Sequence, residues 1–235
     1  MRPWSGHLPA AGSPRLRDRI ARTPDGPVRT LHRGRDAVYF AVERPGSVSW
    51  CLGLAGADAA AVPNALRTAL PDLRSVDPAS ARIVGGVLRL GDAQVRLTRL
   101  VDVRVPRLRR VPPAAVPDDP DEIAGLIGSG EGLTPYGDDV VCGWLAVQRA
   151  ARRATPEVDA AIRTAFPRTA LLSATLLDCA ILGEVLPEFA AFVASLGTLD
   201  EPRRAAAVAG IGASSGRGLL AGARMALAGE TVSVA

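Results

Sequence analysis

The sequence contains no lysine, and all 28 of its basic residues are arginine. This absence excludes a Schiff-base lysine and the lysine of a phosphate-binding P-loop from the chain. Histidine is almost as scarce, because His7 and His32 are the only two. Neither histidine lies in the glycine-rich segments described below, so a cysteine nucleophile there would lack its usual histidine partner.

Cysteine is also scarce. Cys51, Cys142 and Cys179 are far apart, odd in number and form no CxxC pair. This spacing argues against a zinc site and against a disulfide framework, and it favours a reducing compartment. Cys142 and Cys179 fall in apolar, helix-like stretches, where buried and unreactive thiols are usual. We therefore predict a chain without a metal site or a resident cofactor.

Long hydrophobic runs are missing as well. No window reaches about 18 uninterrupted apolar residues, which is the length that a membrane helix needs. Residues 1–27 are rich in arginine and proline and lack the apolar core of a secretory signal. We expect a flexible tail over residues 1–27, no membrane association and a cytoplasmic location. The 48% share of apolar residues is nevertheless large enough to form a buried core.

The net charge of +4 raises the question of nucleic-acid binding. The arginines are spread along the chain, with local pairs at Arg109–Arg110, Arg152–Arg153 and Arg203–Arg204. Aromatic residues make up only 4% of the chain, and none are interleaved with these pairs. Single-stranded nucleic acids are usually held by basic side chains together with stacking aromatics. We therefore do not expect a nucleic acid as partner.

The first half of the chain has the pattern of a β region. From Val28 to about Val105, short β-branched or aromatic runs alternate with glycine, proline and aspartate. The clearest hairpin is "VLRLGDAQVRL", in which alternating apolar residues flank the turn pair Gly91–Asp92. One stretch, "AAAVPNALRTAL" over 59–70, is expected to be helical. We assign a β-rich domain to residues 28–110.

The second half has the pattern of helices. The segment 105–120 holds five prolines and is expected to be a linker. Asp119–Pro120 and Thr155–Pro156 each combine a capping residue with a proline at the first helical position. Most of the following helical stretches end on glycine, as helix C-termini often do. We predict a helical domain over residues 118–235 and an α+β fold: a mostly antiparallel β region followed by a helical bundle.

One helix start carries more glycine than capping requires. In "LIGSGEGLTPYGDDVVCGWLA", Gly128, Gly130 and Gly132 precede Thr134, which fits as the N-cap, and Pro135, which fits as the first helical residue. Each glycine costs about 1 kcal/mol of backbone entropy relative to alanine. Glycines before a helix leave N–H groups bare, and such groups form anion sites. We therefore predict that this loop binds substrate.

Two aspartates follow in the first helical turn. Negative charge there offsets the helix macrodipole, which accounts for one of them. Adjacent side chains on a helix project about 100° apart, so Asp138 and Asp139 are expected to serve different purposes. One can hold the loop by accepting N–H bonds, and the other can face a substrate as a base, an acceptor or a Mg²⁺ ligand. Both are candidate catalytic residues.

A second helix start has a similar composition. In "GIGASSGRGLLAG", Ser214 or Ser215 can cap a helix that begins near Gly216. Arg217, at the start of that helix, could bind a carboxylate or phosphate, although a solvated first-turn arginine is the simpler interpretation. Two such starts meeting at one pocket would suit an anionic ligand. Ser173, four residues after Thr169 in "RTALLSATLL", is a weaker candidate for the pocket wall.

These motifs together resemble a known family. The segment "GSGEGLTPYGDDVVCGWLA" is similar to the glycine-rich signature of the AllH-like proteins, which are subunits of oxamate carbamoyltransferase. "RTALLSATLLDCAILG" and "GIGASSGRGLLAG" resemble two further helices of that family. The resemblance maps family positions onto a set of residues here: Gly130, Gly132, Thr134, Pro135, Asp138, Asp139, Ser215 and Gly216. It implies an α+β protein of ureide and nitrogen metabolism that works with two other subunits.

The resemblance implies that a carbamoyl group moves between oxalurate and phosphate. We therefore favour a carbamoyl- or acyl-transfer enzyme, or a subunit of one, that acts on small carboxylate or phosphate-bearing substrates. In that interpretation Asp138 or Asp139 positions or deprotonates the nucleophile. The alternative is a non-catalytic subunit that binds a small anion or serves as a scaffold. The absence of lysine, of a histidine in these motifs and of a plausible cysteine nucleophile favours this alternative. A third interpretation is Mg²⁺-dependent hydrolysis or phosphoryl transfer through the paired aspartates.

Overall fold

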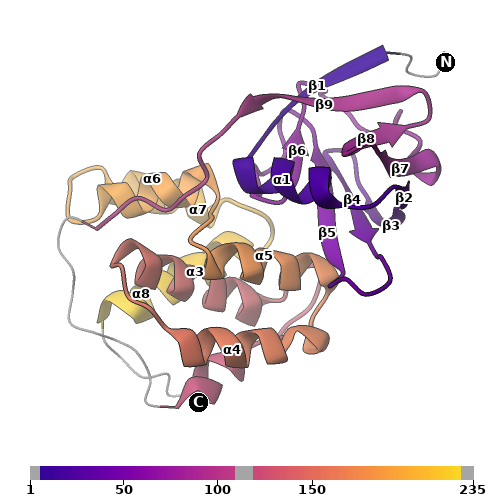
Figure 1. Ribbon diagram of the computed structural model, residues 1–235. Coiled ribbons are helices and arrows are strands. Elements are labelled where there is room, and N and C mark those ends of the chain that lie inside the picture. The colour runs from indigo at the N-terminus through magenta and orange to yellow at the C-terminus, as the bar shows by residue number, and fades with distance from the viewer. Residues whose placement is uncertain (1–5, 109–118, 229–235) are drawn as a thin grey trace. The chain divides into compact units, whose positions relative to one another are not determined.

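A computed structural model describes residues 6–108 and 119–228 (Figure 1). The chain divides into two compact units between Asp102 and Val103, and each unit is described by itself. The first contains a sheet with one α-helix, and the second is helical. The predicted α+β class, with the β region first, is confirmed. No helix in the described ranges is long and apolar enough to cross a membrane.

The first unit is built around one nine-stranded sheet with the strand order β2-β7-β8-β9-β1-β6-β5-β4-β3. Its elements are β1 Gly6–Gly12, α1 Pro14–Arg22, β2 Gly26–Pro27, β3 Arg29–Arg33, β4 Ala37–Val42, β5 Trp50–Ala55, β6 Ala65–Arg67, the 3-10 turn η1 Pro78–Ser80, β7 Ala81–Val84, β8 Val87–Leu90 and β9 Ala93–Leu100. β1 and β9 pair in parallel, as do β5 and β6, whereas the other neighbouring strands are antiparallel.

The sheet is nearly closed into a barrel. Its two edge strands, β2 and β3, are separated in the sequence by Val28 alone. The chain therefore brings the two edges of the sheet close together at this point. The buried faces of the strands share one apolar core that includes Phe40, Leu54 and Ile83. Closure of this kind leaves little exposed edge for pairing with another chain.

The predicted flexible tail over residues 1–27 is wrong from Gly6 onward. β1 lies between β9 and β6 in the sheet, and α1 follows it directly. The Ser13 hydroxyl caps α1 by accepting the Leu16 N–H at 3.1 Å, and the Leu16 side chain is buried. β1 is held by pairing with β9, which comes more than eighty residues later, so the local arginine- and proline-rich composition does not reveal it.

The helix expected over residues 59–70 is also wrong. The segment contains β6, which pairs in parallel with β5. Ala65 lies opposite Gly53, where an added Cβ would come within 2.8 Å of the Ala65 Cβ. Sheet pairing here overrides the helix propensity of an alanine-rich run. The predicted hairpin is present, because Leu90 pairs with Ala93 across the two-residue turn, in which Gly91 has φ +58°.

The second unit packs its helices around α3. Its elements are α2 Pro120–Ala124, α3 Tyr136–Ala150, α4 Pro156–Thr164, the 3-10 turn η2 Phe166–Arg168, α5 Leu171–Ile181, α6 Pro187–Ser195, α7 Glu201–Ala209 and α8 Ser215–Ala228. Most of α3 is buried, and Trp144 is the largest fully buried side chain. Because α3 is surrounded, the side chains in its first turn lie inside the unit and not on its surface.

Two expected helix starts are present. The Asp119 carboxylate accepts the Asp121 N–H at 2.9 Å, and Pro120 is the first residue of α2. Thr155 precedes α4, which begins at Pro156. The proline-rich segment 105–120 falls largely outside the described residues, as does the pair Arg109–Arg110. The part that precedes it runs along the helical unit, where the Val105 N–H donates to the Gly183 carbonyl at 2.7 Å.

Candidate functional site

The first turn of α3 departs from the predicted cap. Thr134 was expected to cap the helix, but α3 begins at Tyr136 with Pro135 as its N-cap and no side-chain cap bond. The Pro135 carbonyl accepts the N–H groups of Asp138 and Asp139. The Thr134 hydroxyl instead lies 3.0 Å from the Ser215 hydroxyl at the start of α8. This contact joins the two glycine-rich segments that the sequence placed far apart.

The three alternate glycines of the loop are needed for backbone reasons. Gly128, Gly130 and Gly132 have φ values of +83°, +111° and +94°, a region that side chains disfavour. An added Cβ would also lie 2.5 Å from the Arg168 carbonyl oxygen at Gly128 and 2.9 Å from the Tyr136 nitrogen at Gly130. At Gly132 nothing lies within 4 Å. The loop is therefore tightly packed where it begins and open further along.

The open part of the loop offers unused donors. No hydrogen bond joins the N–H groups of residues 130–134 to another residue in the described parts of the chain. Residues 129–133 are exposed to solvent. Two large hydrophobic residues are also exposed here, Leu133 by 39% and Tyr136 by 43% of their surface. Successive free N–H groups in a glycine-rich turn are suited to holding an anion.

Asp138 is a buried connector. Its side chain is 1% exposed, and its Oδ1 accepts the Gly128 N–H at 2.7 Å. Its Oδ2 accepts the Ser173 hydroxyl at 2.5 Å and the Thr169 hydroxyl. The carboxylate thus ties the glycine loop to the start of α5. The predicted substrate-binding residue Ser173 is itself 2% exposed and directed at Asp138, so its hydroxyl supports the loop from within.

Asp139 has a different environment. It is 6% exposed, and its Oδ2 is buried without a hydrogen-bond partner among the described residues. Burial raises the pKa of Asp139 to about 7, while a hydrogen bond from Ser215 lowers it and the charge of Asp138 adds to the rise. A buried carboxyl with a free oxygen and a pKa near neutrality is a typical candidate for a functional site.

α8 begins at Ser215, so Ser214 supplies the cap through its backbone carbonyl, which accepts the Gly218 N–H at 3.0 Å. Gly216 is buried, and an added Cβ would lie 1.8 Å from the Val208 carbonyl oxygen. Arg217 is exposed and donates to the Ala213 carbonyl at 2.9 Å. The structure therefore brings Ser215 to Thr134 and Asp139, whereas Gly216 serves packing and Arg217 faces its own loop.

The sequence did not reveal how closely α3 and α8 pack. An added Cβ would lie 2.0 Å from the Leu219 carbonyl oxygen at Gly143 and 1.8 Å from the Val140 carbonyl oxygen at Gly222. At Gly218 it would lie 2.7 Å from the Asp139 Cβ. The extra glycines of α8 therefore allow α3, and with it Asp139, to pack directly against the first turns of α8. The spacing of Gly218 and Gly222 by four residues on one face was the signal available in the sequence.

Cys142 stands one helical turn after the two aspartates. Burial raises the pKa of its thiol well above the usual value, and the charges of Asp139 and Asp138 add to this effect. The thiol is therefore held in its protonated form, which is a poor nucleophile. Among the described residues no three histidine, cysteine, aspartate or glutamate side chains come together as a metal-binding group.

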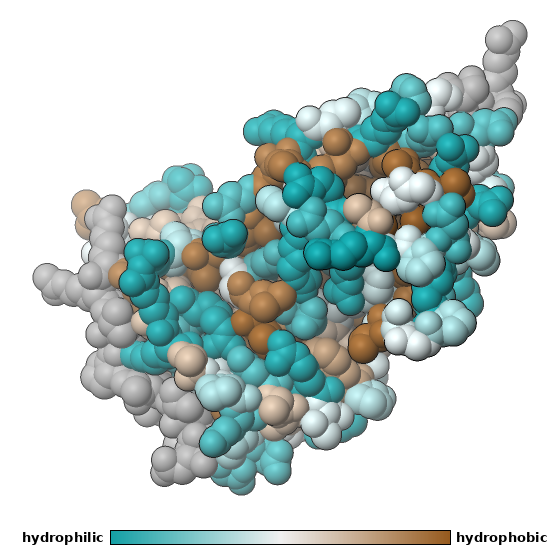
Figure 2. All heavy atoms as spheres, in the orientation of Figure 1, coloured by the Kyte–Doolittle hydropathy of each residue, from teal (hydrophilic) through white to brown (hydrophobic). Residues whose placement is uncertain are grey.

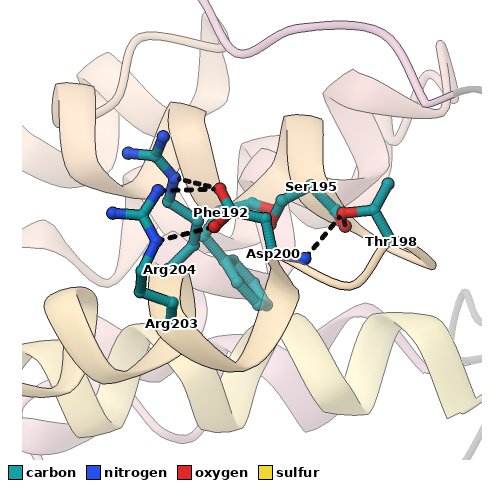
Figure 3. Close-up of polar contacts among 6 residues, drawn as sticks. All are labelled: Phe192, Ser195, Thr198, Asp200, Arg203 and Arg204. Atoms are coloured by element: carbon teal, nitrogen blue, oxygen red, sulfur yellow. Dashed lines mark hydrogen bonds and ion pairs between the residues drawn. The ribbon is translucent and has the colours of Figure 1, made fainter.

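Both arginines of one basic pair share a single acidic partner. Figure 3 shows Asp200, before α7, with both carboxylate oxygens turned toward Arg203 and Arg204. The nitrogen–oxygen distances are 2.6 and 2.7 Å, and these bonds lower the pKa of Asp200 to about 2. The Ser195 carbonyl also accepts a hydrogen bond from the Thr198 hydroxyl within this turn.

Hydrophilic residues predominate on the face shown in Figure 2, with hydrophobic clusters between them.

The fold and the site define an α+β protein whose helical unit holds a glycine-rich loop, two hydroxyls in contact and a buried carboxyl. Residues 126–227 match the family model of oxamate carbamoyltransferase subunit AllH, and this match supports an AllH-like assignment of that segment. The description of this family is consistent with a carbamoyltransferase-associated subunit. No curated protein and no solved structure matches the chain.

Proposed function

We propose that this chain takes part in carbamoyl or acyl transfer on a small carboxylate or amide, with Asp139 as the group that accepts and returns the proton. The observation that carries the proposal is the Asp139 carboxyl. It is buried, its Oδ2 has no partner among the described residues, and it lies beside Ser215 at the start of α8. The other candidate aspartate, Asp138, is occupied in holding the loop.

The site has the two components that such a transfer needs. A general acid or base works best when its pKa lies near the working pH, and the pKa of Asp139 is about 7. The free N–H groups of residues 130–134 could hold a substrate carboxylate or phosphate, or stabilise the oxyanion that develops on the attacked carbonyl. Loss of one such donor typically raises the barrier by about 3 kcal/mol.

A non-catalytic subunit that binds a small anion or acts as a scaffold is the second candidate. Two observations favour it. The Asp138 carboxylate is already hydrogen-bonded to the loop, and neither of the two histidines belongs to the helical unit. The hydroxyls of Thr134 and Ser215 and the loop N–H groups would suffice to bind an anion without any proton transfer.

The first experiment is a thermal-shift screen of the full chain against oxamate, oxalurate, carbamoyl phosphate and phosphate, with and without Mg²⁺. A ligand at a hundred times its Kd adds about 2.7 kcal/mol of stability, which corresponds to a shift of a few degrees for a chain of this size. We expect a shift with at least one anion that Gly130→Val removes. A shift that requires Mg²⁺ would favour metal-dependent chemistry through the aspartates, and a chelator would then abolish it.

The two candidate functions separate on turnover. In the assembled complex with its partner subunits, transfer catalysed by Asp139 predicts that Asp139→Asn still binds the anion but loses turnover by two orders of magnitude or more, about 3 kcal/mol in the barrier. Asp92→Asn, in the exposed hairpin turn of the other unit, is the matched control. Full turnover by Asp139→Asn would contradict the catalytic proposal and would favour the second candidate, a non-catalytic subunit that binds an anion.

A further inference from the structure

Ser215 occupies an unusual position for a serine at a helix start. It is the first residue of the 14-residue α8 and is half-buried. Its hydroxyl hydrogen-bonds to the Asp139 carboxyl and lies 3.0 Å from the Thr134 hydroxyl. The backbone carbonyl of Ser214 already begins the helix, so the Ser215 side chain is not committed to capping.

We propose that Ser215 is the nucleophile of the transfer reaction and carries the transferred carbamoyl or acyl group as a covalent intermediate, with the Asp139 carboxylate as its base. This inference rests on the proposed function and deepens it. A serine nucleophile needs a base within hydrogen-bonding reach and further groups that fix its geometry. Asp139 and Thr134 occupy those two positions around Ser215.

The packing of the two helices explains how the carboxyl reaches the serine. Gly218 lies one turn after Ser215, and a side chain there would collide with the Cβ of Asp139. Its absence lets Asp139 lie against the first turn of α8. The positive end of that helix also favours the negative charge that develops on the serine oxygen during attack. The Asp139 Oδ2, buried and without a partner in the described residues, is free to take up a proton.

The two half-reactions balance without any redox change. In the first, the Ser215 Oγ forms a bond to the carbonyl carbon of the donor, and its proton passes to the Asp139 carboxylate. The bond between that carbon and the leaving nitrogen or oxygen breaks, and Asp139 returns the proton to the leaving atom. In the second, an oxygen or nitrogen of the acceptor attacks the same carbon, the carbon–Oγ bond breaks, and the acceptor's proton returns to Ser215 through Asp139.

The test is to mix the full chain with excess carbamoyl phosphate at pH 8, quench with acid and map the peptides by mass spectrometry. The absence of lysine confines unspecific carbamoylation to the cysteines and the chain terminus. We expect one carbamoyl group on Ser215 in the wild type and in the control Thr164→Ala, whose hydroxyl donates within its own helix. Carbamoylation of residue 215 should be absent in Ser215→Ala and should fall at least tenfold in Asp139→Asn. An unmodified Ser215 in the wild type overturns the inference.

Turnover of the assembled complex separates this inference from the function on which it rests. Loss of turnover in both Ser215→Ala and Asp139→Asn supports the covalent route. Full turnover in Ser215→Ala, with loss in Asp139→Asn, overturns the covalent route and leaves direct transfer assisted by Asp139. Should Ser215→Ala fail to fold, Ser215→Cys replaces it. The cysteine variant should become carbamoylated on sulfur, and the additional change Asp139→Asn should slow this modification at least tenfold. Equal modification with and without Asp139→Asn would mark it as unspecific and contradict the inference.

Discussion

Asp138 and Asp139 are neighbours in the first turn of α3, but their carboxyl groups meet different parts of the helical unit. Asp138 accepts hydrogen bonds from the loop and from α5, whereas the Oδ2 of Asp139 has no partner in the described residues. The helix itself causes the difference, because successive side chains point about 100° apart. One aspartate therefore faces α5 and the other faces α8, and the arrangement favours Asp139 as the group available for chemistry.

The stability of the protein should fall as the pH rises from about 4 to about 7. Burial raises the pKa of Asp139 from 3.8 to about 7 in the folded chain. Within this window the folded state still holds a proton that the unfolded state has released, so deprotonation favours unfolding. At pH 8 the full effect corresponds to at most about 4 kcal/mol. Urea unfolding at several pH values measures it.

Asp139→Asn supplies the comparison for the pH effect. The variant carries no titrating carboxyl at this position, so its stability should change less between pH 5 and pH 8, and it should exceed that of the wild type at pH 8. The exposed Asp121→Asn is the control and should follow the wild-type curve. A wild-type midpoint that stays constant between pH 5 and pH 8 would show that Asp139 titrates normally.

Asp138→Ala should destabilise the helical unit by about 3 kcal/mol, because it leaves the buried hydroxyl of Ser173 and the hydroxyl of Thr169 without their acceptor. Denaturant unfolding measures this loss. The double variant with Ser173→Ala should lose less than the sum of the two single changes, since both remove the same bond. Strict additivity would indicate that the two side chains do not interact.

Gly222→Ala should cost about 3 kcal/mol or more, because the new methyl group would lie 1.8 Å from the Val140 carbonyl oxygen and force α3 and α8 apart. Gly210→Ala is the matched control. It ends α7 with φ −77°, and its nearest neighbour would be 3.6 Å away, so its stability should change by less than about 1 kcal/mol. Equal melting temperatures for the two variants would contradict the close packing.

Arg149→Met should be strongly destabilising. The Arg149 guanidinium and the Asp159 carboxylate are both 16% exposed and 2.5 Å apart, and Arg149 also donates to the Ile181 carbonyl. Removal of one partner of a largely buried pair typically costs about 3–5 kcal/mol, because the other charge stays behind. Arg163→Met is the control, since its 3.8 Å contact with Asp178 is more exposed and should contribute less than about 1 kcal/mol. Thermal unfolding of both variants measures these two losses of stability.

Local signals in the sequence predicted the features that depend on neighbouring residues. Asp119–Pro120 and Thr155–Pro156 indicate the starts of α2 and α4, because capping and the fixed φ of proline act within a few residues. The turn at Gly91 follows from the alternation on either side of it. β1 and β6 were missed, since β1 pairs with the distant strand β9, and β6 lies between β5 and the distant strand β1.

The candidate site divides in the same way. The sequence by itself determined that a glycine-rich loop precedes two aspartates, that a second glycine-rich helix begins near Gly216, and that this chain supplies no lysine to any chemistry. Only the tertiary structure decided that Thr134 meets Ser215, that Asp138 is bound to the loop, and that Asp139 keeps a buried oxygen without a partner in the described chain. These outcomes depend on how α3, α5 and α8 pack. A local pattern such as the spacing of Gly218 and Gly222 indicates that a helix can pack closely, but it does not tell which distant segment that helix meets.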